Sequence, residues 1–545
     1  MAKRKAARKS AKRAPKRKPA ARATRPTTRR ASSGSRRASR RRATAAAAPV
    51  IQSWPTDPMG GIPPLQLAAP DMPGAPLPTR IIAPARAPVA QIYPLGTPGF
   101  RYWTAAEALR RAATFWTSVG VTGWHPDVGA SIPVRLDDGV DLNAYYARND
   151  FPAEDVKQGL SFFHDTVRDV ATSRQITVFS GESPDVVAHE LGHGVLDSLK
   201  PALFELASIE AAAFHESFGD MSAILTALQL PSVRQAVLEE TDGNLRRNSS
   251  VSRVAEQLGF AIRQRSPAAV DRDSLRNAAN SFIYVDPLTL PSTGPATQLT
   301  RAAHNFSRVF TGAFLEALGG MVSRLAAQPG ADDVQQASFD MGRILSQGAT
   351  GAPVSTKFFQ AVAEQMVLVD SRLFGGKYAE ALTTAFIRRG LMSVRSLAAP
   401  EAVGASSARA AVAAVRFSAA AAGRGPRRTA AADKPVEVPI DGAALGLTVK
   451  TLYVSAPPVD DVSAPPPAMM AGVAARETLV MPRLTDIQAF VEALIVRGRV
   501  SMPPAIGPRR GLVASLSQVR KHATHYLSKR PDEALELKRI AFECC

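Results

Sequence analysis

The sequence predicts an α+β protein, and two features of its hydrophobic pattern support this fold class. Between residues 100 and 181, a segment of helical composition at 105–119 is mixed with short β-type runs. These runs, rich in Ile, Val and Phe, lie at 132–136 and 176–179. From about 184 to 392, apolar residues recur instead at spacings of three and four, the period of an amphipathic helix. The first part should therefore carry a sheet, and the second should be mainly helical.

Length and composition indicate a multi-unit globular protein. The chain has 545 residues, which is longer than a single core normally supports. Apolar residues make up 45% and charged residues 21%, as in ordinary globular proteins. No run of uncharged apolar residues is long enough to predict a membrane-spanning helix. The only cysteines, Cys544 and Cys545, are adjacent and cannot link distant parts of the fold, which fits a reducing compartment.

The net charge of +20 is concentrated in one segment. Residues 1–48 contain 19 Lys and Arg and no Asp or Glu, so the remaining chain is nearly neutral. Strong repulsion with little to bury predicts a disordered tail. Two interpretations stay open: non-specific binding of a polyanion such as nucleic acid, or a solvating or targeting tail. The tail lacks the apolar core of a secretory signal peptide, which favours the cytoplasm over secretion.

The other boundaries follow from shifts in composition. Residues 49–95 hold twelve prolines and predict an extended linker. A second linker, rich in Ala and then in Pro, is predicted around a short β-type segment. The predicted units are a disordered basic tail at 1–48, a Pro-rich linker at 49–95, a β/α lobe at 96–200, a helical lobe at 201–398, a linker with a short β segment at 399–475 and a small C-terminal unit at 476–545.

One predicted helix, at 184–199, carries two histidines with the spacing of a metal site. Ser183 can cap this helix, and Pro184 suits its first position, where no amide donor is needed. His189 and His193 are four residues apart, so both imidazoles leave the same helix face. Two histidines placed in this way can bind one zinc ion.

Carboxylates near these histidines complete the predicted site. Glu190 projects about 100° round the helix from His189, close enough to act as a base on a water at the ion. Catalytic zinc needs a third protein ligand. Glu216 lies in a helical segment and shares a face with Asp220. We therefore predict Glu216 as that ligand and Asp220 as the partner that orients a ligating histidine. The alternative is that these His and Glu side chains only satisfy each other in a polar core.

With this spacing the sequence resembles thermolysin and its relatives, the gluzincin zinc metallopeptidases. The resemblance covers roughly residues 100–395 and implies a two-lobed fold, one catalytic zinc ion and peptide substrates. It also implies that Glu190 is the general base of an endopeptidase. The matching residues surround the predicted ligands: Ser180, Gly181, the run from Asp185 to His193, Glu216 and Asp220.

The resemblance implies roles for residues outside this motif. Asn143 and Ala144, followed by two tyrosines, are similar to the family's edge strand that hydrogen-bonds the substrate backbone. His304 resembles the family's histidine that stabilises the oxyanion, and Arg246 its substrate-binding arginine. Taken alone, these residues fit a turn, a helix cap and an ordinary surface charge.

The sequence also departs from the family pattern. His215 takes the place of a usual asparagine, no carboxylate precedes His304, and Phe204 stands near a family tyrosine. The family's acidic calcium cluster cannot be recognised, so zinc is the one cofactor expected. Two alternatives remain open: a zinc-binding relative with weak turnover that binds peptides, and a nucleic-acid-associated protein tethered by the basic tail.

Overall fold

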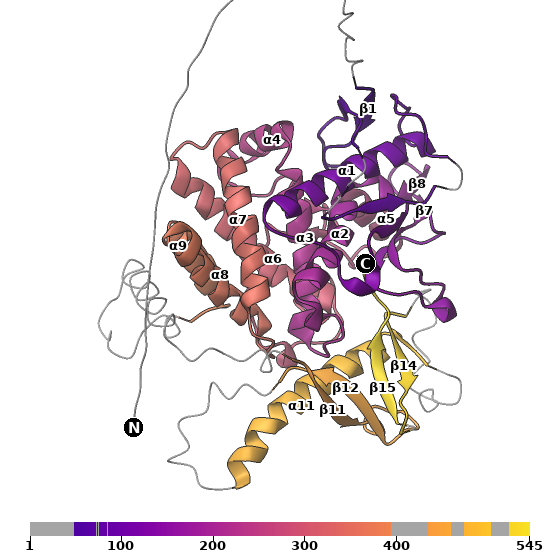
Figure 1. Cartoon of the computed structure of the whole chain (residues 1–545), viewed down its shortest axis with the longest axis vertical. Coiled ribbons are helices and arrows are strands. Elements are labelled where there is room, and N and C mark those ends of the chain that lie inside the picture. The colour runs from indigo at the N-terminus through magenta and orange to yellow at the C-terminus, as the bar shows by residue number, and fades with distance from the viewer. Residues whose placement is uncertain are drawn as a thin grey trace, which may run out of the picture. The chain divides into compact units, whose positions relative to one another are not determined.

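A computed structural model of the chain has a mixed α+β fold, as predicted (Figure 1). The predicted tail, apart from Ala48, and most of the Ala-rich part of the second linker lie outside the described residues. The structure describes residues 48–71, 74, 76–83, 86–393, 434–458, 473–502, 523–532 and 534–544.

A five-stranded sheet supports the site, with the order β16-β5-β6-β4-β3. The strands are β3 (Thr79–Ile81), β4 (Ile132–Arg135), β5 (Ala144–Ala147), β6 (Gly159–Phe162) and β16 (Ala541–Glu543). β3, β4 and β6 run parallel, and β5 is antiparallel to β6. The outer edge of β5 pairs with β16, which comes from the far end of the sequence. A hairpin of β7 (His164–Arg168) and β8 (Gln175–Phe179) follows β6 and leads toward the next helix. The two predicted β-type runs are β4 and β8.

Helix α1 (Pro98–Ser118) begins earlier than the predicted segment at 105–119. The Thr97 hydroxyl accepts a hydrogen bond from the Phe100 amide at 3.3 Å, and Pro98 occupies the first turn. These residues supply a cap and a pre-set backbone angle, so the helix starts there. Its buried face includes Trp116, which stacks on Phe218 with ring centroids 4.9 Å apart.

The helix predicted at 184–199 is α2 (Pro184–Leu199), and both ends agree with the prediction. The Ser183 hydroxyl accepts a hydrogen bond from the Val186 amide at 3.4 Å. The helix ends just before Pro201, which begins a short 3-10 turn. Every residue from Pro184 to Asp197 is buried, so α2 runs through the centre of the fold.

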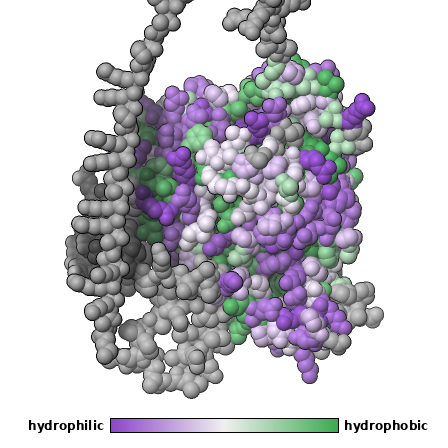
Figure 2. Space-filling view, in the orientation of Figure 1, coloured by the Kyte–Doolittle hydropathy of each residue, from purple (hydrophilic) through white to green (hydrophobic). Residues whose placement is uncertain are grey.

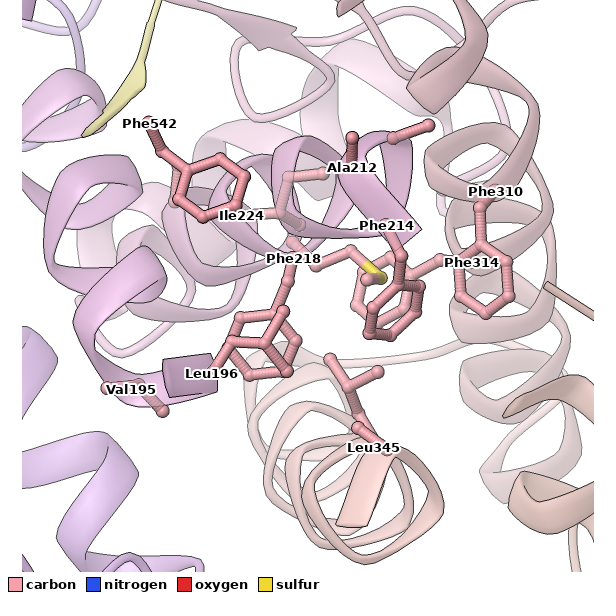
Figure 3. Packing of buried hydrophobic residues seen from close by; sticks show 14 of the residues in the cluster. Val195, Leu196, Ala212, Phe214, Phe218, Ile224, Phe310, Phe314, Leu345 and Phe542 are labelled. Carbon is pink, nitrogen blue, oxygen red and sulfur yellow. The ribbon is translucent and has the colours of Figure 1, made fainter. Parts of the chain in front are cut away.

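The second half is helical, as predicted, and packs around α3. Its helices are α3 (Ile209–Ala227), α4 (Pro231–Thr241), α5 (Glu256–Arg265), α6 (Ala303–Leu325), α7 (Ala331–Gly351), α8 (Phe358–Phe374) and α9 (Ala379–Arg388). All residues of α3 are buried. Aromatic rings fill the space between α3 and α6, where Phe214 meets Phe310 edge-on at 5.1 Å (Figure 3). On its other side α3 packs against α2, where the Ser222 hydroxyl donates to the Ala188 carbonyl at 2.8 Å.

The prediction of an extended linker at 49–95 is wrong, because part of this segment belongs to the folded body. β1 (Val50–Ser53) and β2 (Leu65–Ala68) form a hairpin, and β3 joins the main sheet. Asp57 is buried and accepts hydrogen bonds from the Ser183 hydroxyl at 2.7 Å and the Gln257 amide at 2.9 Å. Proline lowers the capacity for regular hydrogen bonding but does not prevent packing, so proline content misled the prediction.

The C-terminal unit begins near residue 434, earlier than the predicted 476. Its sheet has the order β11-β12-β15-β14-β13. The elements are β11 (Val436–Asp441), β12 (Thr451–Ala456), α11 (Val473–Val496), β13 (Val500–Ser501), β14 (His525–Lys529) and β15 (Leu535–Arg539). The short β segment predicted inside the second linker is therefore the β11–β12 hairpin of this sheet. One residue after β15, the chain leaves this sheet and enters β16 of the main sheet.

The surface of the described residues gives no sign of a membrane-spanning helix. None of their helices is both long and apolar enough to cross a bilayer. On the face shown in Figure 2, hydrophilic and intermediate residues cover most of the described surface.

A buried carboxyl on α3 should make stability depend on pH. Glu210 accepts hydrogen bonds from the Tyr284 hydroxyl at 2.6 Å and from the Phe359 amide at 2.8 Å. Burial outweighs these bonds and raises its pKa to about 8. The folded chain therefore binds this proton more tightly than the unfolded chain does. The stabilisation is complete below about pH 4.5 and is lost as pH rises toward 8.

We expect Glu210→Gln to flatten this dependence. At most about 5 kcal/mol of unfolding free energy should be lost by the wild type across this interval through Glu210. The measurement is the thermal unfolding midpoint between pH 5 and 8 for wild type, Glu210→Gln and the control Glu239→Gln, at an exposed site on α4. A Glu210→Gln profile as steep as that of the wild type would contradict the assignment.

Candidate metal centre and peptide groove

Two histidine side chains on α2 face a common point inside the protein. His189 and His193 are completely buried, and their ring centroids lie 4.8 Å apart with nearly perpendicular planes. Among the described residues, neither Nε2 atom has a hydrogen-bond partner. Two such orphaned imidazole nitrogens in a protein interior require an explanation.

Glu216 brings a carboxylate from α3 to both histidines. Its Oε2 atom lies 3.7 Å from His189 Nε2, and its Oε1 atom lies 3.9 Å from His193 Nε2. Two ligand atoms that each lie about 2 Å from one ion must lie within about 4 Å of each other. Each Nε2 atom therefore lies within the span that one ion could bridge to a Glu216 oxygen, and such an ion would satisfy the two orphaned nitrogens.

A second combination of side chains also fits an ion. Ligand atoms of His189, Glu190 and His193 all lie within 4.8 Å of one another. We favour Glu216 over Glu190 as the carboxylate ligand because it comes from a second helix and brings an oxygen within 4 Å of each Nε2 atom. Two imidazoles and one carboxylate suit zinc, although this donor set also accepts other transition metals.

Asp220 and Arg276 orient His189 from behind. Asp220 Oδ1 lies 3.0 Å from His189 Nδ1, as the sequence predicted. The Arg276 guanidinium contacts both Asp220 oxygens at 2.8–2.9 Å. Burial alone would raise the pKa of Asp220, but Arg276 and His189 lower it to about 2. Asp220 is therefore a carboxylate that can accept a hydrogen bond from His189 Nδ1, which would leave Nε2 for a metal.

Glu190 is placed to act as a base. Its side chain is completely buried, and neither carboxylate oxygen has a hydrogen-bond partner among the described residues. Burial raises the pKa of Glu190 well above its usual value. A carboxylate that has lost its water shell beside a metal site is a strong proton acceptor.

His304 reaches the same site from the start of α6. Its Nε2 atom lies 3.2 Å from Glu216 Oε2 and 2.6 Å from the backbone carbonyl oxygen of Glu543. Its side chain is 21% exposed, whereas those of the histidines on α2 are fully buried. His304 therefore lies beside the candidate ligand Glu216, and its role toward an oxyanion stays a prediction.

The predicted substrate-binding strand is β5, and its outer edge is occupied. Asn143 directly precedes this strand, and its side-chain oxygen accepts a hydrogen bond from the Ala144 amide at 2.9 Å. The Ala144 carbonyl accepts a hydrogen bond from the Cys544 amide at 2.9 Å. This outer side of β5, now filled by residues 541–544, is the candidate peptide groove, and the Ala144 carbonyl is a backbone acceptor within it.

Arg246, predicted to bind substrate, lies elsewhere: it lines a separate cavity with Glu316, Arg324 and Glu380. The arginine beside the candidate ligands is Arg276, whose Nη1 atom donates to the Cys544 carbonyl at 2.7 Å. The dipeptide Leu-Arg occurs at both 245–246 and 275–276. The two arginines differ in their ion pair with Asp220, which only Arg276 forms. That contact depends on the fold and cannot be read from the sequence.

Two departures from the family pattern line an aromatic pocket. The Phe542 ring stacks on His215 at 3.9 Å and on His193 at 5.1 Å between centroids. Phe204 meets the same ring edge-on at 5.5 Å. Burial lowers the pKa of His215 well below its usual value, so its ring is neutral and suits an apolar stack. In the sequence, His215 and Phe204 stood out only as differences from the thermolysin family.

Gly219 provides the space that His189 needs. A Cβ atom added there would lie 2.5 Å from His189 Nδ1, which is too close for the ring to stay in place. Replacement of a helical glycine by alanine ordinarily stabilises by about 1 kcal/mol. We expect the opposite here: Gly219→Ala should lower both the unfolding temperature and the zinc content. Gly351→Ala, at an exposed position ending α7, is the control, and full zinc content in Gly219→Ala would contradict the packing argument.

Comparison with models of known protein families and with curated proteins finds no match to this chain. A function for this chain must therefore be inferred from the geometry of the site.

Proposed function

We propose that the chain is a zinc-dependent endopeptidase with a two-lobed, thermolysin-like architecture. The single observation that carries the proposal is the juxtaposition of a buried His-His-Glu set with strand β5, whose outer side pairs with the extended backbone of β16. A metal site alone serves many chemistries. A metal site beside a strand-pairing groove favours a peptide as substrate.

The arrangement of elements supports the two-lobed part of this proposal. In the proposed arrangement, the main sheet and α1 belong to the first lobe, and α3 with the later helices belongs to the second. α2 lies between them and carries His189, Glu190 and His193, while α3 adds Glu216. The candidate ligands thus come from the two helices at the junction.

The residues of this chain divide the work of hydrolysis. His189, His193 and Glu216 would hold the ion, which when bound polarises a carbonyl group and makes water more acidic. Glu190 takes a proton from the attacking water and delivers it to the leaving nitrogen as the C–N bond breaks.

The groove supplies orientation and charge stabilisation. His304 donates to the oxygen on which negative charge develops, at the place where it now contacts the Glu543 carbonyl. Ala144 accepts from a backbone amide, and Arg276 donates to the next carbonyl. These contacts fix the peptide so that Glu190 meets one particular bond.

A second candidate is a peptide-binding protein with little turnover. Phe204 favours it, because a phenyl ring stands where the resemblance implies a hydroxyl that assists the oxyanion. Both candidate functions predict binding of a peptide and a metal ion, but only the endopeptidase cleaves the peptide bond.

Cleavage of an unfolded protein tests the proposed function. Purified full-length chain is incubated with a reduced and carboxymethylated protein, before and after removal of metal, and fragments are identified by mass spectrometry. We expect fragments that disappear with chelation and return with zinc. Cleavage that survives chelation would contradict the proposal. So would the absence of cleavage in a Phe542→Ala chain, in which the strand that occupies the outer side of β5 is weakened.

A further inference from the structure

The outer edge of β5 is closed by the chain's own C-terminal strand. In the antiparallel β5–β16 pair, Ala541 lies opposite Ala147, Phe542 opposite Tyr146 and Glu543 opposite Tyr145. The Cys544 amide extends this ladder with its bond to the Ala144 carbonyl. Residues 541–544 therefore lie where an added peptide strand would lie.

One peptide bond of this segment is held next to the candidate metal ligands. The Glu543 carbonyl accepts from His304 Nε2, which also lies 3.2 Å from Glu216 Oε2. On the other side of that bond, the Cys544 amide meets the Ala144 carbonyl, and the Cys544 carbonyl accepts from Arg276. The Glu543–Cys544 bond is thus positioned at its carbonyl, its amide and the following carbonyl.

Side chains of the segment fill pockets of the groove. Phe542 is 3% exposed and packs among His193, His215 and Phe204. The Glu543 carboxylate forms an ion pair with Arg499, which comes from the C-terminal unit. The contacts include a specific aromatic pocket and do not consist of backbone pairing alone.

The start of the segment is anchored as well. Arg539 donates from its backbone to Glu205 at 2.8 Å and from its side chain to the Phe204 carbonyl at 2.6 Å. The Ile540 amide donates to the Thr524 carbonyl at 2.8 Å. These bonds deliver the strand to the groove immediately after β15.

We propose that residues 540–544 occupy the peptide groove in the manner of a substrate and keep the site closed to other peptides. This inference rests on the proposed function of the groove. It also assigns a substrate class: extended peptides with an aromatic residue directly before the residue whose carbonyl meets His304.

A tethered occupant competes strongly with free peptides. Linked ligands act at effective concentrations in the millimolar range, so weakly binding peptides rarely displace them. The apparent dissociation constant of a free peptide equals its intrinsic value divided by the fraction of open groove. Weakening the tethered strand should therefore raise peptide affinity.

The register of the strands shows where a disulfide could hold β16 against β5 without changing the side chains that fill the groove. The pair Cys544–Ala144 is hydrogen-bonded, and hydrogen-bonded and non-hydrogen-bonded pairs alternate along an antiparallel ladder. Ala541 and Ala147 are therefore a non-hydrogen-bonded pair, in which side chains are closest. Ala147→Cys with Ala541→Cys should form a disulfide across this pair.

The probe is the fluorescein-labelled peptide Arg-Ile-Ala-Phe-Glu-Ser, with binding followed by fluorescence anisotropy. Full-length chains carry Glu190→Gln so that binding is measured without hydrolysis. We expect Phe542→Ala to bind the probe at least tenfold more tightly than the parent, and Phe374→Ala, which alters a ring packed on Tyr378, to match the parent. The oxidised Ala147→Cys/Ala541→Cys chain should not bind the probe, and reduction should restore binding.

Equal probe affinity in the parent and in a folded Phe542→Ala chain would overturn the proposal. Equal probe affinity in the oxidised and reduced forms of the Ala147→Cys/Ala541→Cys chain would also overturn it. This second comparison does not require Phe542→Ala to fold. Hydrolysis in chains that keep Glu190 separates this proposal from the proposed function. Tighter binding without hydrolysis retains the closed groove and rejects the peptidase, whereas equal hydrolysis by wild type and Phe542→Ala retains the peptidase and rejects the closed groove.

Discussion

Replacing Glu190 by glutamine is expected to lower the turnover number by at least about 100-fold while zinc content stays at one ion per chain. Proton transfer by a positioned side chain typically contributes about 10²- to 10⁴-fold. Glutamine keeps the shape of the side chain but cannot accept the proton. Glu190 is completely buried, so bulk water cannot easily replace it as the base.

The effect of Glu190→Gln should be measured in the wild-type and Phe542→Ala backgrounds, because a closed groove would lower both rates. Glu182→Gln is the matched control, since Glu182 is a buried carboxyl that pairs with Arg101 at 3.3 Å, away from the histidines. It should retain turnover. Full turnover by Glu190→Gln would remove Glu190 from the mechanism, and loss of zinc would make Glu190 a metal ligand.

Replacing Asp220 by asparagine is expected to weaken zinc binding by about 10- to 100-fold, the usual effect of losing a residue that orients a ligating histidine. The amide cannot provide the negative charge that holds the His189 proton on Nδ1. It also leaves Arg276 buried without its carboxylate partner. The loss of that pair should reduce stability by about 3–5 kcal/mol.

A second buried aspartate separates these two effects. Asp197, on the same helix as the histidines, pairs with Arg148 and accepts from the Tyr146 hydroxyl at 2.7 Å. Asp197→Asn should lower the unfolding temperature without changing zinc affinity, measured by competition with a chelator. Equal loss of zinc affinity in both variants would indicate general destabilisation and contradict the orienting role of Asp220.

Local signals predicted the centre of the fold well. Ser183 and Pro184 define the start of α2, and Pro201 limits its end. The spacing of His189 and His193 then places both rings on one face. Such features depend on residues within one or two turns, so they can be read directly from the sequence.

Features that depend on distant contacts could not be predicted. Arg246 and Arg276 have the same preceding residue, and only the fold brings Arg276 to Asp220. β16 pairs with β5 from the opposite end of the described chain, and no local pattern specifies that register. The proline-rich segment could not be placed for the same reason, because its composition does not reveal that Asp57 accepts a hydrogen bond from Ser183 inside the folded body.

Diffraction from crystals of the full-length chain grown with zinc, recorded on both sides of the zinc absorption edge, would locate the metal. We expect one anomalous peak about 2.0–2.2 Å from His189 Nε2, His193 Nε2 and a Glu216 oxygen, with Glu190 and His304 outside the ligand set. Absence of a peak at these histidines in zinc-containing crystals, or a peak bound by Glu190 in place of Glu216, would contradict the proposed metal site.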